Sequence, residues 1–481
     1  MSTVQANVAS TPAGRLSPRA RLESLCDGGS FRPLRSAVLS RRPGNSARPG
    51  DGVIAGAGRV GGRPVFCYCQ DPSFLGGSLG EVHAETIVRT MVQAGEAGAP
   101  VVGFIESGGA RLQEGHAALA GYGRIFRASV KLAGRIPQIS IVGGVSAGGG
   151  AYSPALTDFV IMTREARLFL TGPRVVEEAV GERVSMEELG GPRVHGSNGV
   201  SQIVTETEED AVARARELLG LLPRAIGEPP PTGTPLEPEI GDPGVTVPGN
   251  PRRVYDVRET VRAIVDRSSM LEIYARWGAG IFTGMARLNG RPIAVVANQP
   301  HRFGGVIDAE AAEKTAVFVN DCNRFGLPLA VLTDTPGFMP GLRQERAGVI
   351  RHGASLLRAF AAASVPKVTV ILRKAYGGAA ITMNSRDLGA DAVFAWPGAE
   401  IGIMSAGQAV GIVHRRSLED AGQGDRDQLA DEYSEEHLTA AAAAASGFVD
   451  EVIEPSETRD SLDWAFSTLQ DNSPGSTGAI S

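Results

Sequence analysis

Apolar and polar residues alternate in the first part of the chain in a way that predicts strands followed by helices. VIAGAGRV (53–60) and PVFCYCQ (64–70) predict two strands joined at the Gly61-Gly62 turn. HAETIVRTMVQAGEAG (83–98) has helical periodicity and ends at a glycine, and PVVGFIES (100–107) predicts a buried strand that enters a glycine turn. Such alternation implies crossover connections and a layered α/β architecture.

The remaining pattern divides the chain into domains and connecting segments. A stretch dense in Pro and Gly cannot hold a helix and predicts an inter-domain linker. Both ends are polar and poor in apolar residues, apart from RLESLCDGGSF, which is expected to be helical and then to turn. The predicted parts are an N-terminal arm, partly flexible, at 1–50, a first domain at 51–225, the linker at 226–253, a second domain at 254–465 and a flexible tail at 466–481.

The two predicted domains are copies of each other. IAGAGRVGGRPV begins at Ile54 and FTGMARLNGRPI begins at Phe282, 228 positions later. GAPVVGFIESGGAR and GLPLAVLTDTPGFM keep that spacing, and IPQISIVGGVSAGGGAY and VPKVTVILRKAYGGAAI are 229 positions apart. This period is far longer than the roughly 20 to 50 residues of a solenoid repeat, so the chain is predicted to hold one domain twice.

Composition narrows the class of protein. The 47 basic and 53 acidic residues are mixed along the chain, which does not indicate nucleic-acid binding. The four cysteines lack the spacing of a zinc ribbon and are expected to be reduced thiols in the core. No signal peptide and no run of about 18 apolar residues is present, so we expect a cytoplasmic protein without a membrane span.

Each copy has a distinctive strand that runs into a glycine cluster, at residues 148–150 and 377–379. If a helix follows, backbone amides at its start are unpaired, and the helix dipole favours negative charge there. Such amides could stabilise the oxygen of an enolate as charge develops on it. The alternative is that the glycines only permit close packing of strand and helix, and the duplication alone does not separate these interpretations.

Other catalytic patterns are weaker. The seven histidines show no HExxH motif or close pair, so no metal site is predicted. No GxSxG elbow, Walker loop or early GxGxxG is present, which argues against a serine hydrolase, a P-loop nucleotidase and a Rossmann dehydrogenase. Four carboxylates lie at or just after predicted strand ends, where they could act as general bases or merely as loop caps and ion pairs: Glu106, Glu114, Asp334 and Glu345.

Long motifs in a fixed order carry a resemblance to a known family. They are GGSLGEVHAE (76–85), SGGARLQEG (107–115), YSPALTDF (152–159), ANQP (297–300), DTPGFMPG (334–341), GVIRHGASLL (348–357) and RKAYGGA (373–379). With these motifs the chain, from about residue 17 onwards, closely resembles the carboxyltransferase β subunit of biotin-dependent acyl-CoA carboxylases, of the propionyl-CoA carboxylase type.

The resemblance implies a fold and an assembly. The expected fold is a pair of crotonase-like (ClpP/crotonase) domains, each a superhelix of ββα units. The expected assembly is a homo-hexameric ring, with the active site between the N-terminal domain of one subunit and the C-terminal domain of another. The N-terminal domain is expected to hold coenzyme A, and the C-terminal domain to face biotin.

The resemblance also implies the reaction. Carboxybiotin, carried on a partner protein, releases CO2; the biotin enolate takes the α proton of an acyl-CoA thioester, and the thioester enolate attacks CO2. Two backbone oxyanion holes hold the two enolates, and no side-chain acid or base is required. A separate biotin carboxylase and biotin carboxyl carrier α subunit is expected, because neither an AMKM-type biotin site nor an ATP-binding half is present.

Site residues follow from the same motifs. The resemblance implies that the catalytic amides are those of Gly148 and Gly149 in the first copy and Gly378 and Ala379 in the second, with a shift of the pair by one residue as the alternative in either copy. The resemblance makes six further residues candidates for substrate binding, with turn stabilisation as the alternative for the first and the fourth of them. They are Ser107, Gly108, Gly109, Arg111, Tyr152 and Ile381.

The acyl group and the physiological role are further expectations. The apolar, branched Ile381 indicates a short acyl group such as acetyl or propionyl, so that the product is malonyl-CoA or methylmalonyl-CoA. Two alternatives remain at this stage: a related biotin-dependent decarboxylase or transcarboxylase component, and a non-catalytic structural paralogue in a mixed complex.

Overall fold

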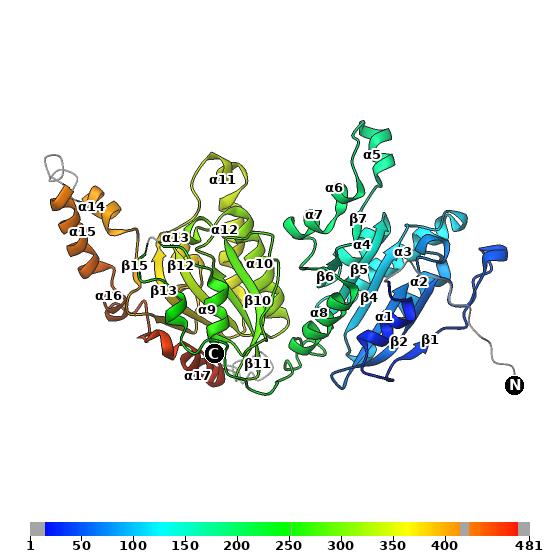
Figure 1. The fold of residues 1–481 in the computed structure, drawn as a ribbon, viewed down its shortest axis with the longest axis horizontal. Coiled ribbons are helices and arrows are strands. Elements are labelled where there is room, and N and C mark those ends of the chain that lie inside the picture. Colours follow the sequence, from blue (N-terminus) through cyan, green and yellow to red (C-terminus); the bar gives the residue numbers. More distant parts are fainter. Residues whose placement is uncertain (1–14, 252, 414–422, 470–481) are drawn as a thin grey trace, which may run out of the picture. The chain divides into compact units, whose positions relative to one another are not determined.

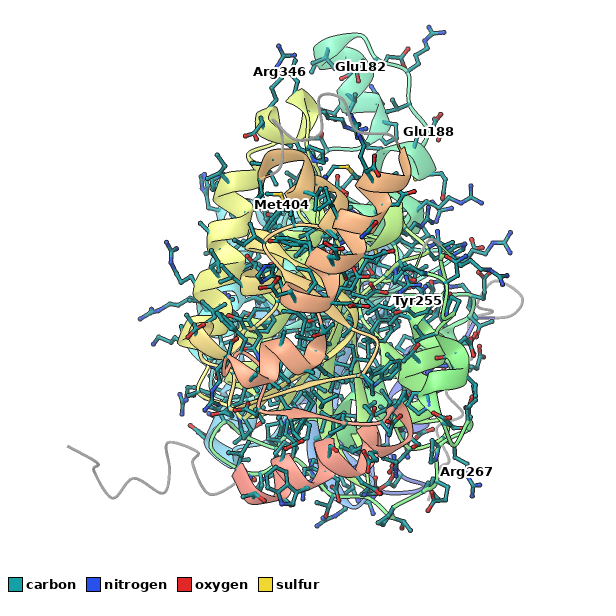
Figure 2. All side chains as sticks on the ribbon, turned by 90° about the vertical axis from the view of Figure 1, so that its left-hand side faces the viewer. Glu182, Glu188, Tyr255, Arg267, Arg346 and Met404 are labelled. Atoms are coloured by element: carbon teal, nitrogen blue, oxygen red, sulfur yellow. The ribbon has the colours of Figure 1, made fainter. Side chains whose placement is uncertain are left out.

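The computed structural model describes residues 15–251, 253–413 and 423–469. The chain divides into two compact units, Met1–Ile226 and Gly227–Ser481, and the second begins at the start of the Pro/Gly-rich stretch. Each unit is built on one sheet with helices against it (Figure 1). Charged side chains of both signs, such as Glu182 and Arg346, point outward into solvent (Figure 2).

The sheet of the first unit has the order β1-β2-β3-β4-β5-β6-β8, and β7 pairs with the far end of β5. The β1-β2 and β2-β3 pairs are antiparallel, and all later pairs are parallel. Its strands are β1 (Arg32–Leu34), β2 (Val53–Val60), β3 (Arg63–Gln70), β4 (Val101–Ser107), β5 (Gln138–Ala147), β6 (Phe159–Thr163), β7 (Arg167–Phe169) and β8 (Ile203–Thr205).

Helices contact both faces of this sheet, which is why β4 is buried along its whole length and apolar as far as Ile105. Ile105 belongs to the core cluster that includes Tyr122 of α3, whereas its neighbour Glu106 bonds Arg21 of α1. The helices are α1 (Pro18–Leu25), α2 (Glu81–Ala97), α3 (His116–Leu132), α4 (Gly149–Ala155), α5 (Pro173–Val180), α6 (Met186–Gly190), α7 (Pro192–Ser197) and α8 (Glu208–Leu221).

The second unit repeats this plan with the order β16-β14-β13-β12-β11-β10-β9, and β15 pairs with the end of β13. Its strands are β9 (Leu271–Glu272), β10 (Ile281–Leu288), β11 (Arg291–Asn298), β12 (Leu329–Thr335), β13 (Lys367–Tyr376), β14 (Ala392–Ala395), β15 (Glu400–Gly402) and β16 (Glu451–Val452). Its helices are α9 (Val257–Ile264), α10 (Ala309–Arg324), α11 (Leu342–Arg346), α12 (Val349–Ala362), α13 (Gly377–Thr382), α14 (Ala406–Val413), α15 (Gln423–His437), α16 (Ala440–Ala445) and α17 (Thr458–Leu469). The predicted α/β class is confirmed.

The duplication extends to individual hydrogen bonds. Asp27 accepts from both amides of the β2-β3 turn and binds Arg216 of α8 at 2.9 Å. Asp266 accepts from both amides of the β10-β11 turn and binds Arg459 of α17 at 2.8 Å. In both units this carboxylate follows a short helix, α1 or α9, so the repeat reaches back into the predicted N-terminal arm.

Several predictions concern the chain ends and the chain as a whole. Within the predicted arm, α1 buries Leu22 and Leu25, and α17 extends to Leu469, inside the predicted tail. The predicted flexibility of 1–14 and 470–481 falls outside the described residues.

The four cysteines are free and buried, as expected. Among the described helices, none combines the length and apolarity needed to cross a bilayer.

Candidate active-site turns

The first glycine cluster forms a tight turn between β5 and α4. Gly148 has φ +59° and ψ −125°, a conformation that glycine adopts without a side-chain penalty. Its amide donates to the carbonyl of Phe169 at 3.1 Å, so this N–H belongs to the sheet. The next two amides, of Gly149 and Gly150, lie in the first turn of α4, where a helix has no earlier carbonyl to accept them. These two amides are therefore the candidate donor pair at this turn.

The second cluster forms the same turn between β13 and α13. Gly377 has φ +56° and takes the place of Gly148, so Gly378 and Ala379 correspond to Gly149 and Gly150. The expected pair of the second copy thus lies at the start of its helix. The expected pair of the first copy moves one residue forward, because the amide of Gly148 is already bonded within the sheet.

The two turns differ in how closely other side chains pack against their glycines. A methyl group at Gly149 would lie 2.7 to 2.8 Å from carbons of the Tyr122 ring, so this position must be glycine for packing alone. A methyl group at Gly378 would have no atom within 4 Å, and Gly378 is exposed. Close packing therefore explains the glycine at position 149 but does not explain the glycine at position 378.

The turn after β4 lies beside the first glycine cluster. The Ser107 hydroxyl shares a 3.1 Å hydrogen bond with the Tyr122 hydroxyl and accepts from the amide of Gly109 at 3.2 Å. Ser107 is fully buried, so it supports the turn and does not face a ligand. Gly108 is exposed, and its amide donates to Gly76 at 2.9 Å.

Arg111, an expected substrate-binding residue, has its side chain engaged within the protein. Its side chain is fully buried and binds Asp51 at 2.7 Å and Glu114 at 2.8 Å. It also donates to the carbonyl of Ser78 at 3.0 Å, and the ring of Phe74 lies 5.2 Å from its guanidinium carbon. Arg111 therefore stabilises the loops around the β4 turn.

Tyr152 and Ile381 lie three residues after Gly149 and Gly378, at matching places on α4 and α13. Both are half exposed, Tyr152 at 51% and Ile381 at 52%. The ring of Phe126 holds Tyr152 edge-on at 6.1 Å between centroids. Of the expected substrate-binding side chains, these two are the ones that solvent reaches.

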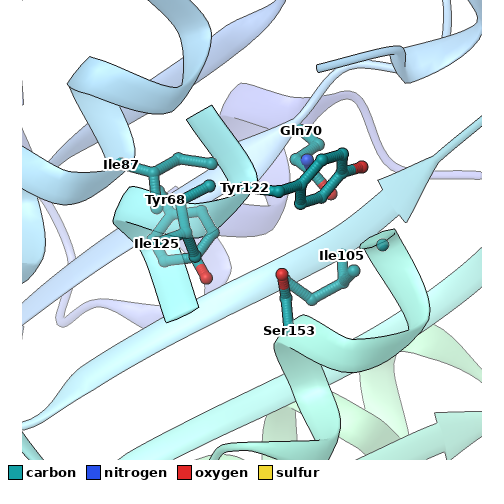
Figure 3. A pocket seen from close by; sticks show the side chains of 8 residues that line it. Tyr68, Gln70, Ile87, Ile105, Tyr122, Ile125 and Ser153 are labelled. Carbon is teal, nitrogen blue, oxygen red and sulfur yellow. The ribbon is translucent and has the colours of Figure 1, made fainter. Parts of the chain in front are cut away.

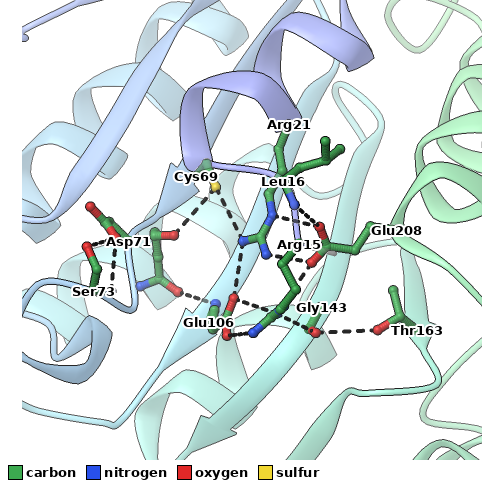
Figure 4. A network of polar contacts seen from close by, with 11 residues as sticks. Arg15, Leu16, Arg21, Cys69, Asp71, Ser73, Glu106, Gly143, Thr163 and Glu208 are labelled. Atoms are coloured by element: carbon green, nitrogen blue, oxygen red, sulfur yellow. Dashed lines mark hydrogen bonds and ion pairs between the residues drawn. The ribbon is translucent and has the colours of Figure 1, made fainter. Parts of the chain in front are cut away.

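The carboxylate at the end of β4 is held by the N-terminal segment. Glu106 binds Arg15 at 2.8 Å and Arg21 at 3.1 Å (Figure 4). Arg15 enters the space above Gly144, where a methyl group would lie 2.1 Å from Glu106 and 3.0 Å from Arg15. Glu106 is thus a buried structural anion rather than a general base.

The corresponding carboxylate of the second unit is Asp334. It accepts from Arg373 at 3.0 Å and from the hydroxyl of Tyr255, a residue labelled in Figure 2, at 2.9 Å. Arg373 occupies the strand position of Gly144, so the guanidinium here comes from the sheet itself. Burial raises the pKa of the Asp334 carboxyl, against the effect of Arg373.

The other titratable candidates are also engaged or remote. Burial lowers the pKa of His83 to about 3, so its ring is neutral. Glu114 is buried against Arg111, and Glu345 is exposed on α11. Across 15–251, 253–413 and 423–469, no three His, Cys, Asp or Glu side chains gather as a metal would require. Backbone amides are therefore the strongest candidates for catalytic groups at the two turns.

A small cavity lies beneath the first turn (Figure 3). It has a volume of about 10 Å³, which is room for about one water molecule. Its walls are formed by Tyr68, Gln70, Ile87, Ile105, Tyr122, Ile125, Gly150 and Ser153. The cavity is too small for a substrate, so ligands must approach the amides from the exposed side of the turn.

Gly150 was predicted as a member of the first glycine cluster but not as one of its two catalytic amides, although the 229-residue alignment pairs it with Ala379 and pairs Gly149 with Gly378. Tyr122 carries no such signal, because its contact with Gly149 joins segments 27 positions apart that only the folded chain brings together.

Comparisons with known proteins agree with these features. The carboxyl transferase domain model matches residues 9–476. The methylmalonyl-CoA carboxyltransferase 12S subunit of Propionibacterium freudenreichii subsp. shermanii is 44% identical over 460 residues, which cover 93% of this chain and 87% of that protein. The propionyl-CoA carboxylase carboxyltransferase subunit of Haloferax mediterranei is 45% identical over 460 residues, covering 93% and 89%.

The fold is also shared with a solved structure. A crystal structure of transcarboxylase 12S, with methylmalonyl-coenzyme A and methylmalonic acid bound, superposes with a TM-score of 0.90 at 41% identity. The match covers 97% of this chain and 91% of the other. The predicted tandem crotonase-like fold is confirmed by this match together with the two parallel-dominated sheets.

Proposed function

Because the chain belongs to the carboxyl transferase family, we propose that it transfers the carboxyl group of carboxybiotin to the α carbon of a short-chain acyl-CoA. One observation carries this proposal: each unit ends its long central strand in the same glycine turn, with φ +59° at Gly148 and +56° at Gly377. Two such turns supply amide donors for two oxyanions, and the reaction forms two.

The donors are the backbone amides at the start of α4 and α13. We assign the amides of Gly149 and Gly150 to the oxygen of the acyl-CoA thioester, and those of Gly378 and Ala379 to the ureido oxygen of biotin. The open space beside Gly378 fits a flat ring that must come close to the backbone. Donors fixed before the reaction lose little reorganisation energy, and removing one such donor typically costs roughly 100- to 1,000-fold in kcat.

The base for the α proton and the carboxyl group that is transferred would both come from carboxybiotin rather than from side chains of this chain. Bound carboxybiotin supplies CO2 and, after its loss, the base that removes the α proton. Glu106 and Asp334 are buried and paired with arginines, which suits a site that needs no carboxylate base. Donor turns retained in both units also argue against a purely structural paralogue.

The proposed acyl group is acetyl or propionyl. Ile381 is half exposed three residues beyond Gly378, where an aliphatic side chain can limit the length of the acyl group. An apolar wall separates substrates that differ by one methylene by only roughly 1 to 3 kcal/mol, so we expect activity with both. The names of the two relatives, which refer to methylmalonyl-CoA and propionyl-CoA, support this range.

We further propose that the chain works as a homo-hexamer with a separate biotin carboxylase and biotin carrier subunit. The relatives are named as carboxyltransferase subunits, and the transcarboxylase 12S structure describes a hexamer. The large exposed aliphatic side chains near both turns, including Leu170 and Ile403, suit burial in such an assembly.

The experiment combines the purified chain with a biotinylated carrier, biotin carboxylase, ATP, labelled bicarbonate and acetyl-, propionyl- or butyryl-CoA. We expect label in the acid-stable product from acetyl- and propionyl-CoA, and much less from butyryl-CoA. Absence of label from every acyl-CoA, with a carrier that a known carboxyltransferase can discharge, contradicts the proposed function. A rate with butyryl-CoA that is orders of magnitude higher contradicts the short-chain assignment.

A further inference from the structure

Helix α3 packs against the first glycine turn through the aromatic side chain of Tyr122. The ring of Tyr122 fills the space where a side chain at Gly149 would stand, with three ring carbons 2.7 to 2.8 Å from that position. The Tyr122 hydroxyl shares a hydrogen bond of 3.1 Å with the Ser107 hydroxyl. Both side chains are buried, so this contact is shielded from water.

Ser107 extends the contact to the neighbouring amide and to the β4 turn. A methyl group at Gly150 would lie 3.2 Å from the Ser107 β carbon and 3.5 Å from the Tyr122 hydroxyl. Ser107 also accepts from the amide of Gly109 at 3.2 Å. Tyr122 and Ser107 therefore pack directly against both residues whose amides face the thioester in the proposed reaction.

The second unit shows that the fold does not require this ring. The buried positions of α3 recur in α12 at a spacing of 231, two or three more than the 228 to 229 of the strand segments, as Ala118 with Val349 and Ile125 with Leu356. At that spacing Tyr122 corresponds to Gly353, and nothing lies within 4 Å of a methyl group at Gly378. The second turn thus forms without an aromatic ring behind its glycine, and the ring of Phe338 lies instead against Gly353 of α12, 3.4 Å from where a methyl group would stand.

We propose that Tyr122 is a positioning residue, which holds the amides of Gly149 and Gly150 in the orientation that carboxyl transfer to the thioester requires. The inference rests on the proposed function and deepens it at the first turn. A rigid ring behind a glycine backbone fixes its position, and a misplacement of about 1 Å in a reacting group can cost roughly 100-fold in rate. The small cavity next to Tyr122 and Gly150 leaves room for such a shift once the ring is removed.

The test compares three single variants of the full chain. The kcat and the KM for propionyl-CoA are measured with the carrier and carboxylase present, and the Tm is measured by thermal unfolding. Tyr122→Leu removes the ring and should lower kcat by about 100-fold. Tyr122→Phe keeps the ring and should lose about tenfold or less, the range expected for one hydrogen bond. Leu132→Ala, a buried change at the far end of α3, should lower the Tm but leave kcat per folded molecule within about twofold of wild type.

The outcomes separate a positioning role from a structural one. Wild-type kcat in folded Tyr122→Leu, or an equal loss of kcat in Leu132→Ala, overturns the inference. If Tyr122→Leu does not fold, Tyr122→Phe is combined with Ser107→Ala and kcat is measured for both single variants and for the double variant. A kcat of the double variant that is no lower than that of the single variants supports action of Tyr122 through Ser107. Losses of kcat that are fully additive overturn the inference. Failure of the proposed function is distinct, because wild type itself then labels no acyl-CoA.

Discussion

Placing a methyl group on each of the two glycine turns should change stability in opposite directions. In Gly149→Ala the new carbon would lie 2.7 to 2.8 Å from carbons of Tyr122, whereas carbon atoms in contact prefer roughly 3.5 to 4.0 Å. The ring cannot swing aside freely, because Tyr122 is buried and its hydroxyl is bonded to Ser107 at 3.1 Å. Overpacking of this kind costs roughly 1 to 3 kcal/mol.

Gly378→Ala meets no atom within 4 Å and requires no left-handed backbone. Its effect comes mainly from the unfolded chain, which loses conformational freedom, and should raise stability by roughly 0.4 to 1 kcal/mol. For a domain of roughly 150 to 250 residues each kcal/mol moves the Tm by about 2 to 4 °C. We therefore expect a Tm lower by roughly 2 to 12 °C for Gly149→Ala and slightly higher for Gly378→Ala.

Scanning calorimetry and urea unfolding of the two variants measure this difference. A third variant checks its cause: in a Tyr122→Leu background the ring is gone, so Gly149→Ala should cost at least about 0.5 kcal/mol less than in wild type. Equal stability changes for the two alanine variants, or a Gly149→Ala cost that persists unchanged without the ring, would refute the packing difference between the turns.

Three further predictions concern other parts of the structure. Arg111→Leu leaves Asp51 and Glu114 buried without their cation, so the free energy of unfolding measured in urea should fall by roughly 3 to 5 kcal/mol. A fall of less than about 1 kcal/mol would contradict the structural role of Arg111. Burial lowers the pKa of Lys314 to about 7 in the folded state, below its value in the unfolded chain. Between pH 7 and about 10.5 the folded state therefore binds fewer protons than the unfolded state. Because of this difference, Lys314 makes the free energy of unfolding rise with pH across that range. Lys314→Met should show a flatter rise in unfolding free energy between pH 7 and 10, and an unchanged slope argues against the buried lysine. Ile381→Ala should raise kcat/KM for butyryl-CoA relative to propionyl-CoA by about tenfold, and an unchanged ratio removes Ile381 from the acyl pocket.

Local patterns predicted the elements of the fold because burial on both faces leaves a clear mark in the sequence. VIAGAGRV and PVVGFIES coincide with β2 and β4 within one residue, and the helical stretch that ends at Gly98 is α2, closed by Gly98 at φ +55°. The internal repeat predicted two units with equivalent turns. These features depend on residues near each other in the chain or on direct comparison of the two copies.

The details of the site depend instead on distant partners, which the sequence does not show. The amide of Gly148 is bonded because β7 brings Phe169 beside the end of β5. The motif around Arg111 indicated substrate binding or turn stabilisation, and it could not show that Asp51, 60 positions earlier, holds this arginine in a buried ion pair. Motif resemblance pointed to these two turns but left open which amides and side chains are accessible to a ligand.

The proposed oxyanion role of the second turn can be tested by removing one amide without changing the fold. Gly378 lies in the first turn of α13, where proline is tolerated, and its surroundings are open, so Gly378→Pro should fold while lacking one N–H. Gly378→Ala, which keeps the N–H, is the matched control. Transfer of labelled carboxyl from carboxybiotin to propionyl-CoA should have a kcat roughly 100- to 1,000-fold lower in the proline variant than in the alanine variant. A kcat within about threefold of the alanine variant, at an equal Tm, would contradict the claim that backbone amides of these turns carry the reaction.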